Sequence, residues 1–128
     1  MNDRFHIVGD PQRSLIRIVM RGHWDVETVR GYKKAIVAAV ERMRVQGCKP
    51  GEIVALVDLR DGGAQSQDVI AAYKDDLDEA NLVPRRLATL VASALFKRQV
   101  ERIAIPNQRF FVDESEALDW LLSADPGE

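Results

Sequence analysis

The sequence has a single cysteine, Cys48, among its 128 residues. One cysteine excludes an internal disulfide and an all-cysteine metal site, and no histidine stands near it to activate the thiol. We expect Cys48 to be an exposed loop residue without a catalytic role. Basic and acidic residues nearly balance at 18 and 20, for a net charge of −2. This balance argues against nucleic acid as a partner.

Long apolar segments are absent as well. No window approaches the ~20 apolar residues of a membrane helix, and residues 1–5 contain no apolar stretch of signal-peptide length. We therefore expect no membrane insertion and a cytoplasmic location. The sequence also lacks a phosphate-binding loop, a dinucleotide fingerprint and a Gly-x-Ser-x-Gly motif. With no catalytic constellation, we expect a protein that is not an enzyme and carries no cofactor.

The composition is that of one globular domain over residues 1–128, with 46% apolar and 30% charged residues. Only the tail, about residues 124–128, looks frayed. Two short alternating segments open the chain at residues 4–9 and 14–22, and the turn residues between them predict a hairpin. Arg17 alternates with the apolar residues of the second segment, so we expect one face of this strand to meet water.

A helical period follows the hairpin. Asp25 can cap a helix of about twenty residues, and Gly47 is a natural stop for it. The apolar residues of this helix recur at steps of three and four, which predicts one buried stripe: Val29, Tyr32, Ile36, Val40 and Met43. Residues 53–59 are then apolar up to Asp58, a run typical of a buried parallel strand.

The second half continues to alternate between helix and strand. A second helix follows the glycines after Asp58, residues 87–92 form a buried strand, and residues 95–104 have a helical period. Residues 109–112 are a short strand, and Asp113 or Ser115 caps a last helix. The order β-β-α-β-α-β-α-β-α predicts an α/β domain with a mostly parallel sheet and an antiparallel strand at its N-terminal edge.

Ligands of open α/β sheets gather at the carboxyl ends of the strands. One loop there holds most of the candidate residues: Asp58, Arg60, Asp61, Gly62, Gly63 and Ser66. Glycines let the backbone approach a bound group closely, and the helix that Ser66 can cap favours an anion at its start. The alternative is that the glycines only turn the chain and Ser66 only caps the helix.

Other candidate sites lack part of the residue set that they need. An aspartate that ends an apolar strand, as Asp58 does, is also the phosphoacceptor of receiver domains. That chemistry requires a carboxylate pair after the first strand and a lysine after the last, which this sequence does not provide. His6 and His23 have no third metal ligand nearby. Basic residues from Arg85 to Arg109 form either a solvated surface or a face for an acidic partner.

Several segments resemble the STAS superfamily. They are Gly22-His23-Trp24-Asp25 at the opening of the long helix, the strand ending Val57-Asp58-Leu59, and residues 109–121, which look like the closing strand and helix of the SpoIIAA-like branch. The resemblance covers about residues 4–123. It implies a single SpoIIAA-like β/α superhelical domain with helices largely on one face of the sheet. Members include anti-sigma-factor antagonists, transporter domains and stressosome proteins, none of them a conventional enzyme.

The resemblance also implies a switch at one position. The antagonists are phosphorylated on a Ser or Thr two residues after the aspartate that ends the strand, and that position here is Arg60. Arginine cannot be the phosphoacceptor of that Ser/Thr switch, but it can pair with a carboxylate or a phosphate. Ser66, the nearest hydroxyl, lies six residues further along the chain.

Two hypotheses for the function remain open. In the first, the chain is a non-enzymatic STAS-like regulatory or interaction domain that binds a protein partner through the loop from Asp58 to Ser66. In the second, it is a small-ligand or lipid-binding module of CRAL-TRIO-like character, with an amphiphilic ligand near Ser93 and Phe96. The first strand has an unpaired edge that a second copy can join, so a homo-oligomer is also compatible with the sequence.

Overall fold

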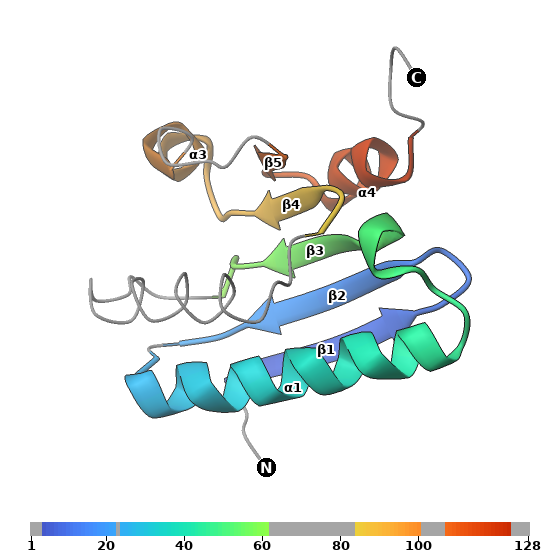
Figure 1. Ribbon diagram of the computed structural model, residues 1–128. Helices are drawn as coiled ribbons and strands as arrows, with labels where there is room; N and C mark the ends of the chain where they lie inside the picture. Colours follow the sequence, from blue (N-terminus) through green and yellow to red (C-terminus); the bar gives the residue numbers. More distant parts are fainter. Residues whose placement is uncertain (1–3, 23, 62–83, 101–106, 124–128) are drawn as a thin grey trace.

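A computed structural model describes residues 4–22, 24–61, 84–100 and 107–123. Its centre is a five-stranded sheet whose strands follow one another in chain order (Figure 1). They are β1 (Phe5–Asp10), β2 (Leu15–Met20), β3 (Val54–Asp58), β4 (Leu87–Leu90) and β5 (Gln108–Phe111). β1 and β2 form an antiparallel hairpin, whereas β2 to β5 are parallel. The expected α/β fold with an antiparallel N-terminal edge strand is confirmed.

The described helices begin close to where the sequence predicts them. They are α1 (Val26–Val45), the short 3-10 helix η1 (Pro50–Glu52), α3 (Ala94–Val100) and α4 (Glu114–Leu122). Asp25 caps α1, and its Oδ1 accepts the Thr28 N–H at 2.8 Å. Asp113, of the two candidates, caps α4.

Part of the predicted chain lies outside the described residues. It includes His23, the glycine pair Gly62 and Gly63, and Ser66 with the helix that it was expected to cap. The final residues of the helix expected over 95–104 and the tail after Ser123 lie outside as well.

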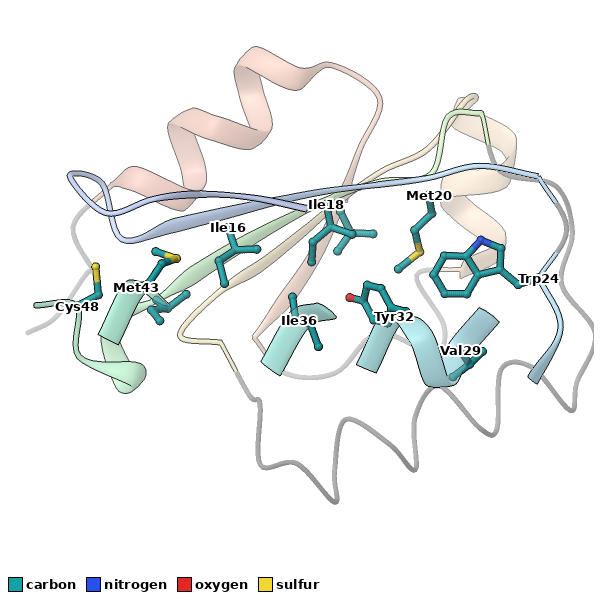
Figure 2. Close-up of a cluster of buried hydrophobic side chains, with 11 residues drawn as sticks. Ile16, Ile18, Met20, Trp24, Val29, Tyr32, Ile36, Met43 and Cys48 are labelled. Atoms are coloured by element: carbon teal, nitrogen blue, oxygen red, sulfur yellow. The ribbon is translucent and has the colours of Figure 1, made fainter. Parts of the chain in front are cut away.

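One face of the sheet packs against α1. Alternate residues of β2 point toward this helix and form a first core with it (Figure 2). The predicted stripe is confirmed at four of its five positions, with Val40 partly buried at the margin. Gly9 of β1 lies under Met43, and a Cβ there would come within 3.0 Å of the Met43 Sδ. Glycine at this position therefore lets α1 approach the strand closely.

Three aromatic rings fix the start of α1 against the hairpin. Trp24 and Tyr32 have ring centroids 5.3 Å apart, and Phe5 lies 5.8 Å from each of them. The Trp24 Nε1–H donates to the Arg4 carbonyl at 3.2 Å. The tilted and edge-to-face geometries are those that aromatic quadrupoles favour.

Cys48 closes the first core at the other end of α1, so the prediction of an exposed loop thiol is wrong. The residue is only 6% exposed. Gly47 turns the chain with a φ of +101°, which places the Cys48 N–H on the Met43 carbonyl at 3.0 Å. The Cys48 Sγ then lies 3.3 Å from the Pro11 carbonyl, under the hairpin turn.

The opposite face of the sheet packs against α4 and forms a second core. Its buried members are Leu15, Val54, Leu56, Ala88 and Leu90 from the strands and Ala117 and Leu121 from α4. Leu15 lies on the side of β2 that was predicted to face water, but it is only 3% exposed because it packs in this second core. The prediction of a water-facing side is therefore wrong at Leu15. The two longest described helices lie on opposite faces, which differs from the expectation of helices largely on one face.

Arginines hold the C-terminal end of α4. Arg85 donates to the Leu121 carbonyl at 3.3 Å, and Arg86 donates to the Trp120 carbonyl and to the Ser123 Oγ. The Trp120 ring also has the guanidinium carbons of Arg86 and Arg109 at 5.2 and 5.1 Å from its centroid. Cations at a helix C-terminus are stabilising. Part of the basic surface expected from Arg85 to Arg109 thus serves the packing of α4.

Candidate functional site

A cluster of four charged side chains lies at the carboxyl end of β3. Asp58 is the last residue of β3, and alternation along the strand directs it to the face that carries Val54, Leu56 and α4. Its side chain is only 11% exposed. A buried carboxylate requires partners, because burial without them is costly.

Arg60 supplies most of those partners. Its Nε donates to the Asp58 Oδ1 at 3.0 Å and its Nη2 donates to the Asp58 Oδ2 at 2.8 Å. The Arg60 backbone N–H also donates to Oδ1 at 3.0 Å. This is the bidentate fork in which arginine binds a carboxylate most strongly. The residue at the expected phosphoacceptor position is therefore bound to the aspartate two residues before it.

Two residues from distant parts of the chain complete the cluster, which we call the rim cluster: Arg17, Asp58, Arg60 and Glu114. Arg17 of β2 lies on the same face, with its Nη2 3.7 Å from the Asp58 Oδ2. Glu114, the first residue of α4, accepts from both guanidiniums through Oε1, from Arg17 and from Arg60, the latter at 3.4 Å. The cluster ties β2, β3 and α4 together and carries no net charge.

The contact between Asp58 and Arg60 favours the ionised forms of both side chains. The hydrogen bond from Arg60 is the main reason why the pKa of Asp58 is lowered from its ordinary value of 3.8, and it outweighs the effect of burial. The same contact raises the pKa of Arg60 above its ordinary value. Asp58 is consequently a permanent anion at neutral pH, with both of its oxygens engaged.

The rim cluster presents part of its surface to solvent. The side chains of Arg17, Arg60 and Glu114 are 37%, 41% and 36% exposed. Val8 pairs directly with Arg17 across the hairpin and is 48% exposed, so an apolar side chain lies beside the charges on the same face. The surface thus combines fixed charges with an accessible apolar residue.

Of the other predicted site residues, the structure describes Asp61, Ser93 and the backbone of Phe96, whereas Gly62, Gly63 and Ser66 lie outside the described residues. Asp61 lies at the same edge of the sheet, and its carbonyl accepts the Gly22 N–H at 3.2 Å. Ser93 is exposed and precedes α3, where its carbonyl accepts the Lys97 N–H at 3.0 Å. Phe96 lies within α3, and its side chain is outside the part that the structure describes.

Sequence reasoning identified Asp58 and Arg60 but missed Arg17 and Glu114. The alternation of residues in β2 predicts only that Arg17 faces water. No sequence pattern distinguishes Glu114 from the other residues at the start of the last helix. The available signal was the parallel register, in which Val19 pairs with Asp58 and so places Arg17 two residues away on the same face. No local feature of the sequence indicates that α4 returns to this point.

Two further features bear on ligands. Within residues 4–22, 24–61, 84–100 and 107–123, no three His, Cys, Asp or Glu side chains are grouped so that they could hold a metal ion. A hollow of about 200 Å³ lies at the opposite end of β2 from the rim cluster, lined by Gly9, Pro11, Ala39, Arg42, Met43 and Gln46. Among the helices described, none is both long and apolar enough to cross a bilayer.

Comparison with known proteins supports the fold. No family model matches the chain, and no curated protein matches it. An uncharacterized protein of the DUF3478 family from Shewanella loihica PV-4, solved as a crystal structure with a SpoIIAA-like fold, superposes with a TM-score of 0.69. The match covers 91% of this chain and 93% of that one, at 20% sequence identity. The chain thus has a SpoIIAA-like fold, in agreement with the resemblance to the STAS superfamily.

Proposed function

We propose that this chain is a non-enzymatic STAS-like regulatory domain that binds a protein partner at the rim cluster. The observation that carries the proposal is the Asp58–Arg60 fork. In the switched members that the sequence resembles, a phosphorylatable hydroxyl follows the strand-ending aspartate at this position. Here a guanidinium occupies it, bound to the aspartate through three hydrogen bonds of 2.8 to 3.0 Å.

The Asp58–Arg60 fork favours a binding surface whose structure does not depend on phosphorylation of this chain. Arg60 carries no hydroxyl, and the bonds from its backbone N–H and its guanidinium set the start of the loop by themselves. Modification of this residue is therefore not needed to hold Asp58 and Arg60 in place. The partner would meet a preformed arrangement, which lowers the conformational cost of association.

The state of Asp58 supports a role without catalysis. A general base works best when its pKa lies near the operating pH and its oxygen can reach a substrate proton. The pKa of Asp58 is lowered by Arg60, and both oxygens already accept hydrogen bonds.

The proposal places the domain in the cytoplasm, where the buried Cys48 thiol stays reduced.

The mixed character of the surface supports a protein as the partner. Interfaces combine apolar contacts with arginine at positions that are partly accessible in the free protein. The rim cluster offers Arg17 and Arg60 beside the exposed Val8, and Val112, just before α4, is 43% exposed.

The test combines affinity capture with native mass spectrometry. Wild type, Arg17→Gln, Arg60→Gln and the control Arg44→Gln are used as baits, and captured proteins are quantified. Arg44 is a suitable control because it is also salt-bridged to a glutamate, Glu41, but lies on α1 on the other face. We expect a partner that wild type and the control retain and that both rim variants lose.

Two results would contradict the proposal. One is a set of captured proteins that does not change between wild type and the rim variants. The other is an amphiphilic small molecule retained by the purified protein in native mass spectrometry, which would favour the ligand-binding alternative. The same spectrum reports the oligomeric state, which is of interest because, among the described strands, β1 pairs with β2 alone and has a free edge.

A further inference from the structure

Two guanidiniums of the rim cluster converge on one carboxylate oxygen. Arg17 and Arg60 each donate from Nη2 to the Oε1 of Glu114. Arg60 is held independently by the Asp58 fork, so its orientation does not depend on Glu114. Planar guanidiniums that point at a common position match the oxygen geometry of carboxylates and phosphates.

Glu114 is the replaceable member of the cluster. Its side chain is 36% exposed, whereas that of Asp58 is 11% exposed. Its contact with Arg60 is 3.4 Å, longer than either bond of the Asp58 fork, so Glu114 is held mainly by its closer ion pair with the partly exposed Arg17. Movement of the Glu114 side chain into solvent would leave two cations facing the exposed side of the rim with only Asp58 to balance them.

We propose that Arg17 and Arg60 form a binding site for a phosphate monoester, and that Glu114 occupies this site within the chain until such a group displaces it. The inference rests on the proposed function, because it identifies the chemistry of the partner as a phosphorylated side chain. Glu114 then acts as an internal competitor that keeps weaker anions out.

The charge balance favours phosphate over a carboxylate from the partner. A partner carboxylate carries the same charge as Glu114 and has to displace a group that is already attached to the chain. A phosphate monoester carries a charge of about −1.5 to −2 at pH 7 and has three acceptor oxygens. Each guanidinium can then bind an oxygen of its own, whereas Arg17 and Arg60 now share Oε1.

The test is a calorimetric titration with N-acetyl-phosphoserine amide and, separately, with inorganic phosphate. Glu114→Gln removes the competing charge and keeps the size of the side chain. We expect it to bind the phosphoserine probe about two- to fivefold more tightly than wild type, the factor that one partly exposed ion pair accounts for. The matched control is Glu41→Gln, which removes an arginine-paired carboxylate on the other face and should leave binding at the wild-type level.

Arginine substitutions in the Glu114→Gln background complete the experiment. Adding Arg17→Gln or Arg60→Gln should remove the gain, with circular dichroism as the check that each variant is folded. Equal affinity of Glu114→Gln and wild type overturns the inference, as does a gain that survives both arginine substitutions. Because the expected gain requires only Glu114→Gln, the inference can fail even if the arginine variants do not fold.

The outcomes separate this inference from the proposed function. Tighter binding of phosphoserine than of inorganic phosphate supports a phosphorylated side chain of a partner as the ligand of the site. Equal binding of the two probes supports the site with free phosphate as its ligand. In a further capture experiment, the partner proteins are first treated with phosphatase. If a partner that depends on the rim cluster is still captured, the inference is overturned and the proposed function remains in place. A gain with phosphoserine but no rim-dependent partner supports the site and overturns the proposed function.

Discussion

The Asp58–Arg60 fork is expected to contribute measurably to stability, and a double-mutant cycle can isolate its contribution. Asp58→Asn and Arg60→Gln each remove one charge and keep a side chain of similar shape. A hydrogen bond to a charged group is worth about 1.5–3 kcal/mol when the group is buried. Asp58 is 11% exposed but Arg60 is 41% exposed, so solvent screens part of the interaction. We therefore expect a coupling free energy of about 1–2 kcal/mol at pH 7.

The pH dependence provides an independent check of the same contact. Because the pKa of Asp58 is lowered in the folded state, its contribution is fully present above the unfolded value of about 3.8 and is lost as pH falls through the lower folded value. Arg60→Gln removes the main cause of this shift. The coupling should therefore persist from pH 7 to pH 5 and decline as the pH falls below about 4.

The assay is urea denaturation followed by circular dichroism at pH 7, 5 and 3.5, with all four members of the cycle measured at equal ionic strength. The control cycle uses Glu41 and Arg44, whose side chains are 56% and 59% exposed and should show a much smaller coupling. A coupling at Asp58–Arg60 no larger than in the control would refute the reasoning. So would a coupling that does not change as the carboxylate is protonated.

Three further predictions concern the cores. Leu90→Ala, at a fully buried position of the second core, should cost about 2–5 kcal/mol of unfolding free energy in urea denaturation, and a smaller loss would contradict its burial. Trp120→Ala should cost about 2–3 kcal/mol because it removes ring contacts with Phe111, Arg86 and Arg109, and a mutant as stable as wild type would show that these contacts are weak. Cys48 should react slowly with a thiol reagent in the native protein and rapidly in urea, whereas fast native reaction would contradict its burial.

Local patterns in the sequence were sufficient for the described strands and the three longer described helices and for their order along the chain. The period of α1, its cap at Asp25 and the apolar run that ends at Asp58 are all set by residues close to one another along the chain. The short connection between the first two strands predicts their antiparallel pairing, and the helices between later strands predict parallel ones. These rules depend on chain connectivity, which the sequence contains in full.

Errors arose where a side chain's surroundings come from distant residues. Cys48 looked like a loop residue, but its burial depends on the hairpin turn at Pro11, which contacts its sulfur. Arg17 is partly exposed, as its alternation with apolar residues predicts, but that pattern does not indicate that α4 returns to the same face and provides Glu114 as its partner. Local periodicity indicates that two faces differ, and it does not indicate what covers each of them.

The sequence alone therefore determined the α/β class, the order of the described elements along the chain and the presence of Arg60 in place of a phosphorylatable hydroxyl, because each follows from residue identity or chain connectivity. The tertiary structure decided which charges meet. Arg17, Asp58, Arg60 and Glu114 come from β2, β3, its following loop and α4, and the pairing of β2 with β3 and the packing of α4 on the sheet bring them together. Coulomb attraction depends on distances between side chains, and folding sets those distances.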